Sequence, residues 1–349
     1  MAEPTVARPE HLRKLNDAYT QIREQIAGVI VGQGEVVDLL LIGMLARGHC
    51  MLEGVPGLAK TLLVSTLAKC LSLDFARIQF TPDLMPSDIT GTEVMEQDRT
   101  TGQRVFRFIH GPIFNHVLLA DEINRTPPKT QAALLEGMQE RQVSAGGQRY
   151  KLPDPFFVLA TQNPIEQEGT YPLPEAQLDR FLLKIFVDYP TQDEERSIYR
   201  LMTGGSVSEP KPILGGEELL ELQQIIRGVP INDMLLNYVM SLVRATRGDA
   251  AESPQFIRDW LLWGAGPRAG QALILSAKAR AALQGRPEVD LEDIRALAKP
   301  VFRHRLVLNY TAEAEGQSPD TVVERLLDTL PVHTAAEASH GAVERVLKA

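Results

Sequence analysis

The sequence predicts an α/β domain with a parallel sheet between helices, followed by a smaller all-α domain. A short apolar stretch at 49–53 ends in a Gly-rich turn, and a helical stretch at 60–71 follows it. Strand, Gly-rich turn and helix in this order open a βαβ unit. Two later stretches, 116–120 and 156–161, are nearly all apolar, which is typical of parallel strands covered on both faces. From residue 191 onward, helical periodicity replaces the strand signals.

Further elements complete the first domain. Amphipathic helices are expected at 11–27 and 35–46, before the first strand, and another helix is expected at 124–139. A further strand is expected at 75–79. Two β-hairpins interrupt the alternating pattern, each with turn residues between its strands. Their strands are expected at 92–96 with 103–108, and at 142–143 with 149–152.

The change of character places a domain boundary near residue 190. Residues 1–190 form the α/β domain and residues 191–349 form the helical domain, which contains a loop at about 203–216. Five helices are expected after that loop, at 216–227, 231–247, 266–283, 291–303 and 320–330.

Composition excludes several classes of protein. The chain has 349 residues, 44% apolar and 23% charged, which are ordinary globular values. A net charge of −9 offers no basic domain for a phosphate backbone, so a nucleic-acid partner is not expected. The N-terminus is polar and no apolar run is long enough to span a membrane. Two cysteines, Cys50 and Cys70, stand in apolar surroundings, so we expect a cytoplasmic protein.

The first chemical motif is Gly54-Val55-Pro56-Gly57-Leu58-Ala59-Lys60-Thr61. It follows the phosphate-loop pattern G-x-x-x-x-G-K-[ST], except that Ala59 stands where the pattern has glycine. Backbone N–H groups of such a loop point at a phosphate. Lys60 would reach the β- and γ-phosphates, and Thr61 would offer its hydroxyl to Mg²⁺. The alternative is a Gly-rich turn before an ordinary helix.

The second motif is an apolar strand that ends in Asp121 and Glu122. Asp121 suits a Mg²⁺ ligand, and Glu122 suits a base that orients the attacking water. Two acids at a strand end can also simply cap the following helix. After a phosphate loop, however, the two motifs supply two halves of one site.

The third motif follows the strand at 156–161, which ends in Thr161-Gln162-Asn163-Pro164. Asn163 could lie beside Glu122 and the γ-phosphate. An isolated Asn before Pro is more often a turn residue, so the position of this motif in the series carries the interpretation.

Taken in order, these motifs resemble an AAA+ ATPase, and more narrowly the MoxR family. The resemblance includes Ala59, which belongs to that family's usual loop, and it spans roughly residues 11–330. The segments that carry it are Glu53 to Thr61, Gln79-Phe80-Thr81-Pro82-Asp83-Leu84, Asp121-Glu122-Ile123-Asn124-Arg125, Ala160 to Pro164, Leu178-Asp179-Arg180-Phe181 and Gly266-Pro267-Arg268.

The resemblance implies a P-loop core with a helical lid, the cofactors ATP and Mg²⁺, and a role for each matching residue. Lys60, Thr61, Asp121 and Glu122 correspond to the Walker residues, and Asn163 to sensor 1. Arg180 matches the arginine finger, which reaches the nucleotide of a neighbouring subunit. Arg268 matches sensor 2 on the lid, acting within its own subunit or on a neighbour. Val31-Gly32-Gln33 lies where the family has its adenine pocket.

The resemblance also implies how the protein works. A finger supplied by a neighbour requires a ring, so a homo-hexamer is expected. MoxR-like ATPases are associated with partners that carry a von Willebrand A-type domain, and a chaperone-like role in maturing such partners follows. The two hairpins match inserts that face a central pore or a partner. Two alternatives remain: a nucleotide-dependent binding switch with little hydrolysis, and a motor on nucleic acid.

Overall fold

The protein is described from a computed structural model, which covers residues 8–97, 104–145, 147–164, 169–204, 209–251 and 253–331. The chain divides into two compact units. Residues 17–223 form what we call the sheet unit, and residues 1–16 with 224–349 form the helical unit. Within the described ranges, none of the helices is both long enough and apolar enough to cross a membrane.

The sheet unit is built on five parallel strands in the order β2-β5-β8-β1-β9. The strands are β1 (Cys50–Glu53), β2 (Phe75–Gln79), β5 (Val117–Asp121), β8 (Phe157–Gln162) and β9 (Leu183–Phe186). Four of them match the expected strands within one residue, and β9 is an addition. In the register of β2 and β5, Gln79 lies opposite Asp121, so the carboxyl ends of both strands meet at one edge.

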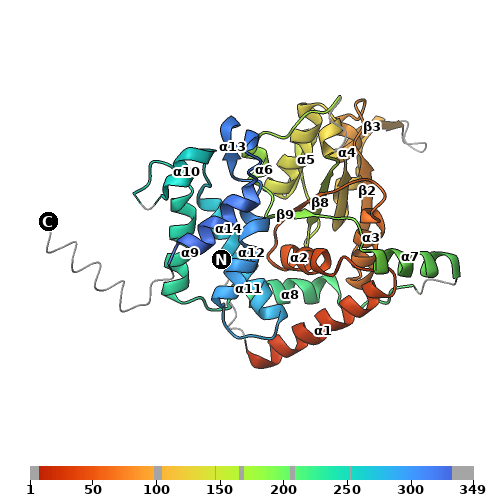
Figure 1. The fold of residues 1–349 in the computed structure, drawn as a ribbon. Helices are drawn as coiled ribbons and strands as arrows, with labels where there is room; N and C mark the ends of the chain where they lie inside the picture. Colours follow the sequence, from red (N-terminus) through yellow and green to blue (C-terminus); the bar gives the residue numbers. More distant parts are fainter. Residues whose placement is uncertain are drawn as a thin grey trace. The chain divides into compact units, whose positions relative to one another are not determined.

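Helices cover both faces of this sheet, which gives three layers (Figure 1). On one face lie α2 (Gly34–Leu45) and α3 (Lys60–Cys70), and on the other lie α4 (Pro86–Thr90) and α5 (Pro128–Glu140). Alternate strand residues face opposite layers. Leu118 and Val158, for example, belong to the buried cluster that includes Leu134 and Leu135 of α5. The expected α/β fold class is therefore confirmed.

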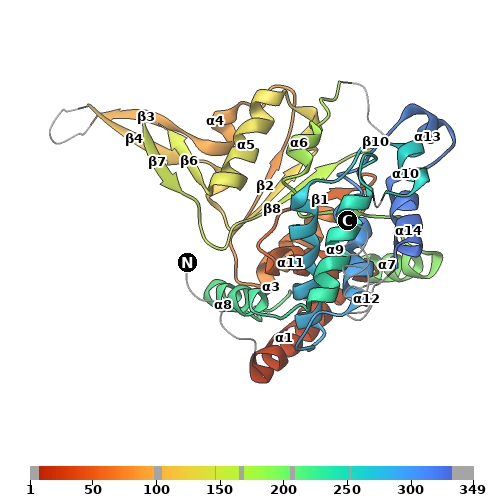
Figure 2. The same ribbon diagram turned by 90° about the vertical axis from the view of Figure 1, so that its left-hand side faces the viewer.

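Two hairpins extend from the sheet unit, as the sequence predicts. One pairs β3 (Gly91–Gln97) with β4 (Arg104–His110), and the other pairs β6 (Gln142–Ala145) with β7 (Gln148–Lys151). Figure 2 shows the β3–β4 hairpin projecting beside β6 and β7. The rings of Phe108 and Tyr150 stack at 4.3 Å and join the two hairpins. Residues 98–103, between the two strands of the first hairpin, lie outside the described residues.

The helical unit contains the helices expected after residue 230 together with two short ones and a small antiparallel ribbon. Asp293 is fully buried there and pairs with Arg280 and Arg286. Its elements are α9 (Asp233–Ala245), α10 (Gln255–Trp260), β10 (Leu261–Trp263), α11 (Pro267–Leu283), α12 (Leu291–Phe302), β11 (Val307–Leu308), α13 (Tyr310–Ala314) and α14 (Pro319–Thr329).

The remaining elements are helices α1 (Pro9–Ala27), α6 (Glu175–Leu178), α7 (Gln192–Gly204) and α8 (Gly216–Arg227), with 3₁₀ turns η1 (Pro112–Phe114) and η2 (Ile123–Arg125). The unit limits fall inside α1 and α8. The domain boundary near residue 190 stays a prediction. Residues 205–208 of the expected loop lie outside the described residues, as do residues 332–349.

Candidate active site

The phosphate-loop motif forms the turn between β1 and α3. Gly57 has φ +86°, which glycine adopts without a steric penalty. At Gly54 the reason is a close approach, because a Cβ there would lie 2.5 Å from the carbonyl oxygen of Val187. Ala59 has φ +53° and ψ +23°, which is a left-handed conformation. For an L-residue this conformation costs about 1–2 kcal/mol. The alanine therefore holds a backbone conformation that glycine would adopt at lower cost.

Lys60 is the first residue of α3, and its ammonium group is held inside the loop. Its Nζ donates a hydrogen bond to the carbonyl oxygen of Gly54 at 2.5 Å. Burial lowers the pKa of Lys60, and the nearby carboxylates of Asp121 and Glu122 partly oppose this shift. The hydrogen bond to Gly54 therefore holds the ammonium group of Lys60 against the loop that would bind a phosphate.

Two polar side chains, those of Thr161 and Arg77, donate hydrogen bonds to the carboxylate of Asp121 at the end of β5. The hydroxyl of Thr161 donates to Oδ1 of Asp121 at 2.5 Å and accepts the backbone N–H of Glu122 at 2.8 Å. The guanidinium of Arg77, on β2, donates to Oδ2 of Asp121 at 3.1 Å from Nε and 2.7 Å from Nη2. Both oxygens of Asp121 are therefore oriented by protein donors.

Glu122 stands at the turn after β5 with φ +57° and ψ +50°, a left-handed conformation. Its Oε2 lies 3.1 Å from the guanidinium of Arg125, three residues further along. Asn163, one residue beyond β8, is 7% exposed. Glu122 and Asn163, which follow β5 and β8, both line one pocket, and the role of each stays a prediction.

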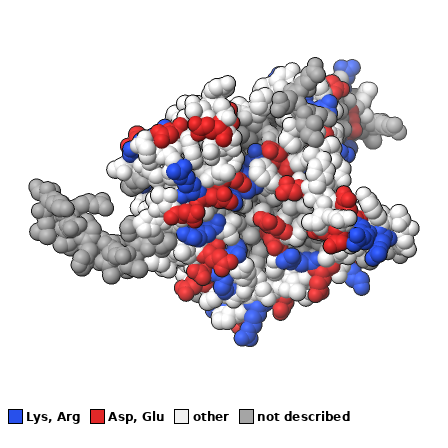
Figure 3. Space-filling model, in the orientation of Figure 1, with Lys and Arg blue, Asp and Glu red and all other residues white. Residues whose placement is uncertain are grey.

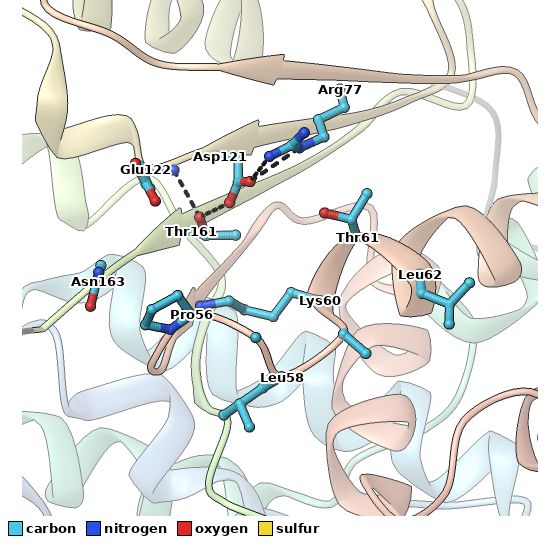
Figure 4. A pocket seen from close by; sticks show the side chains of 12 residues that line it. Pro56, Leu58, Lys60, Thr61, Leu62, Arg77, Asp121, Glu122, Thr161 and Asn163 are labelled. Carbon is cyan, nitrogen blue, oxygen red and sulfur yellow. Dashed lines mark hydrogen bonds and ion pairs between the residues drawn. The ribbon is translucent and has the colours of Figure 1, made fainter. Parts of the chain in front are cut away.

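These groups converge on one pocket of about 440 Å³ (Figure 4). Figure 4 shows the hydroxyl of Thr61 directed toward Asp121 and Thr161. The pocket is lined by 56–62 of the phosphate loop and α3, and by Arg77, Asp121, Glu122, Thr161 and Asn163.

The oxygen atoms at this pocket suit a magnesium ion that is also bound by phosphate and water. They suit less well a metal that is bound by protein side chains alone. The described residues contain no group of three or more His, Cys, Asp or Glu side chains arranged to hold a metal. Mg²⁺ usually keeps several waters and takes one or two protein ligands together with phosphate oxygens. Thr61 and Asp121 both line the pocket and would offer a Mg²⁺ ion two oxygen atoms.

Of the two expected arginines, the one in the sheet unit, Arg180, is not among the residues that line this pocket. In the sheet unit, Nη1 of Arg180 donates to the carbonyl oxygen of Leu135 at 3.1 Å. Its buried Nε has no hydrogen-bond partner among the described residues. Arg268 belongs to the helical unit, at the second residue of α11. The role of each arginine stays a prediction.

Val31-Gly32-Gln33, the expected adenine segment, is the turn before α2. Gly32 has φ +72°, and a Cβ there would lie 2.5 Å from Oε1 of Glu194. The amide of Gln33 donates to the carbonyl oxygen of Asp188 at 3.2 Å. The turn therefore lies against the segment that follows β9, and its contact with a base stays a prediction.

Two polar residues that line the pocket, Arg77 and Thr161, were not among the candidates from the sequence. Thr161 is the second-to-last residue of β8, whereas Arg77 lies in the middle of β2. Ligands bind outside the carboxyl ends of the strands in open α/β sheets. Polar residues in the strands that lead to this edge could therefore have indicated both site residues.

Comparison with known proteins agrees with this geometry. Residues 49–183 match the family described as "ATPase family associated with various cellular activities (AAA)", and residues 259–326 match its lid domain. The chain is 46% identical over 328 residues to Chaperone MoxR1 of Mycobacterium tuberculosis, covering 93% of this chain and 85% of that protein. It is 33% identical to Protein MoxR of Paracoccus denitrificans, covering 92% and 99% respectively.

A solved structure leads to the same family. The crystal structure of a protein from Cytophaga hutchinsonii, assigned as an ATPase, has a TM-score of 0.86 and 44% identity, covering 93% of this chain and 98% of that one. With an AAA core, an AAA lid and MoxR relatives along most of its length, the chain belongs to the MoxR family of AAA ATPases.

Proposed function

We propose that this protein binds ATP with Mg²⁺ in the pocket described above, hydrolyses it, and uses the cycle to remodel a partner protein. One observation carries the proposal: Lys60, Thr61, Asp121 and Glu122 line one pocket although they come from separate segments of the chain. An ordinary Gly-rich turn or a helix cap would not require all four to converge.

Each residue has a part that follows from its chemistry. The loop N–H groups and Lys60 bind the β- and γ-phosphates, and Thr61 and Asp121 hold Mg²⁺. When bound, the metal neutralises charge on the phosphate oxygens. Glu122 accepts a proton from the attacking water and orients it. The ion pair of Glu122 with Arg125 keeps that carboxylate close to the pocket.

We further propose that the active form is a homo-hexamer. Arg180 supports this, because it does not line the pocket of its own chain. A guanidinium from the neighbouring subunit can stabilise the charge that develops on the transferred phosphoryl group, an effect of about 10³–10⁵ in rate. Arg268 is proposed to assist from the lid.

The partner is proposed to be a protein with a von Willebrand A-type domain, and the work a chaperone-like maturation in the cytoplasm. The name of Chaperone MoxR1 supports the chaperone role. The absence of a disulfide at the buried Cys50 and Cys70 fits a reducing compartment. Acidic and basic side chains alternate over the face drawn in Figure 3, which does not favour a nucleic-acid motor.

Steady-state phosphate release with Mg-ATP, measured across protein concentrations, tests this proposal. We expect specific activity to rise with concentration, because the complete site needs two subunits. Lys60→Ala should abolish the activity, whereas Lys129→Ala, a change on α5 outside the pocket, should leave it intact. Activity absent at every concentration, with ATP binding retained, would favour a binding switch instead.

A further inference from the structure

Thr161 lines the pocket, and the proposed chemistry has not yet used its contacts. Its side chain is 1% exposed and lies at the carboxyl end of β8, beside β5. Its one hydroxyl contacts both Asp121, at 2.5 Å, and the backbone of Glu122, at 2.8 Å. These are the two residues assigned to the metal and to the attacking water.

The direction of these two hydrogen bonds follows from their chemistry. The backbone N–H of Glu122 can only donate, so the oxygen of Thr161 is its acceptor. The proton of the hydroxyl is then available for Oδ1 of Asp121, which accepts it as a carboxylate. A single hydroxyl therefore fixes both the rotation of Asp121 and the position of the Glu122 backbone.

The conformation of Glu122 makes this second contact important. A glutamate at φ +57° is in a left-handed conformation that L-residues rarely adopt, and such a residue needs support from its surroundings. Within the sheet unit, Thr161 supplies this support from the strand that leads to Asn163. The carboxyl end of β8 thus positions Asp121 and Glu122 through Thr161, and it also carries Asn163.

We propose that Thr161 is a positioning residue, whose hydroxyl holds the Mg²⁺ ligand Asp121 and the catalytic base Glu122 in their working geometry. This inference rests on the proposed ATPase function. Residues that orient metal ligands by hydrogen bonds typically contribute about 10–100-fold to metal affinity or activity. Loss of the hydroxyl alone, with the shape of the side chain kept, should therefore be costly.

Thr161→Val removes the hydroxyl with little change of volume, and Thr161→Ser keeps it. We expect Thr161→Val to lower kcat about 10–100-fold, and Thr161→Ser to stay close to the wild type. A second readout does not depend on turnover: binding of a fluorescent ADP analogue with Mg²⁺ and in EDTA. Thr161→Val should lose the increase in affinity that Mg²⁺ gives and keep its affinity in EDTA.

A matched control separates positioning from packing. Thr130→Val, on α5, removes a hydroxyl that is also buried and donates to the carbonyl oxygen of Leu84 at 2.9 Å, away from the pocket. We expect it to keep both kcat and the increase in nucleotide affinity that Mg²⁺ gives, which we call the Mg²⁺ increment. If Thr161→Val unfolds, Thr161→Ala should show the same loss of the Mg²⁺ increment.

Two results would overturn the inference. One is a Thr161→Val protein with wild-type kcat and a wild-type Mg²⁺ increment. The other is a Thr161→Ser protein as impaired as Thr161→Val, which would assign the effect to the methyl group. If the wild type binds nucleotide but hydrolyses none, the proposed function fails, while the Mg²⁺ increment of the variants still tests Thr161.

Discussion

Arg77 and Asp121, on the neighbouring strands β2 and β5, form an ion pair in which two guanidinium nitrogens reach the same carboxylate oxygen, at 3.1 and 2.7 Å. Arg77 also donates to the side chain of Gln79 two residues along its strand. The pair places a fixed positive charge beside the carboxylate proposed to hold Mg²⁺. A bound Mg²⁺ ion and the guanidinium of Arg77 would then compete for the negative charge of Asp121.

This competition predicts the effect of Arg77→Gln. Without the guanidinium, Asp121 keeps its bond from Thr161 and gains attraction for Mg²⁺, so the Mg²⁺ concentration for half-maximal nucleotide binding should fall several-fold. Titration of Mg²⁺ against a fluorescent ADP analogue measures it. Arg149→Gln on the β6–β7 hairpin, which removes the same charge away from the pocket, is the control. A higher Mg²⁺ requirement in Arg77→Gln would show that the arginine assists the metal instead.

A shared site predicts that two inactive variants restore each other. Glu122→Gln lacks the base and keeps the finger, whereas Arg180→Ala lacks the finger and keeps the base. A mixed assembly contains some interfaces where an intact Glu122 meets an intact Arg180 from the neighbour. Phosphate release from the mixture should therefore exceed the sum of the separate variants.

The control for this mixing experiment is the double variant Glu122→Gln/Arg180→Ala. Mixed with Arg180→Ala, it supplies no finger and should give no gain. Equal rates from both mixtures would place Arg180 outside the neighbouring site. Because Arg180 also donates to the carbonyl of Leu135, melting temperatures of each variant are needed to confirm that the fold persists.

The helical unit offers a stability prediction at Asp293 on α12. Its carboxylate is fully buried and accepts from Nη1 of Arg280 at 2.6 Å and Nη1 of Arg286 at 2.8 Å. The pairing raises the pKa of Arg286, first through its hydrogen bond to Asp293. Asp293→Asn removes the buried charge that Arg280 and Arg286 share, which should cost about 3–5 kcal/mol.

Glu292 provides a matched control for Asp293. It is the preceding residue and pairs with the same Arg280, at 3.4 Å, but its side chain is 79% exposed. Glu292→Gln should change the free energy of unfolding by less than about 1 kcal/mol, because exposed pairs contribute little. Urea unfolding of both variants compares them directly, and equal losses would contradict the role given to burial.

The differences between sequence and structure have identifiable physical reasons. Strand β9 was not expected because Lys184 interrupts its apolar pattern, and only the fold shows that this lysine pairs with Glu53 at 2.7 Å. The role of Arg77 depends on β2 lying beside β5, which no local pattern specifies. In contrast, Lys60 could be predicted because phosphate binding requires a fixed local spacing around the turn, and Asp121 could be predicted because it ends an apolar strand.

His49 carries a prediction about pH. It is buried at the start of β1, where Nδ1 accepts the backbone N–H of Val158 at 3.0 Å and Nε2 lies 3.3 Å from the carbonyl oxygen of Met138. Burial lowers the pKa of His49 to about 4. In the unfolded chain this histidine takes up a proton near pH 6.5, whereas the folded chain resists it until near pH 4.

The unfolded state therefore binds more protons between these two values, and stability falls as the pH is lowered from about 6.5 to about 4. The stability present above pH 6.5 should drop by up to about 3 kcal/mol across this range. His49→Gln can make similar hydrogen bonds but does not titrate. Urea unfolding at several pH values should therefore give a steeper loss for the wild type than for this variant, and parallel curves would contradict the neutral, buried His49.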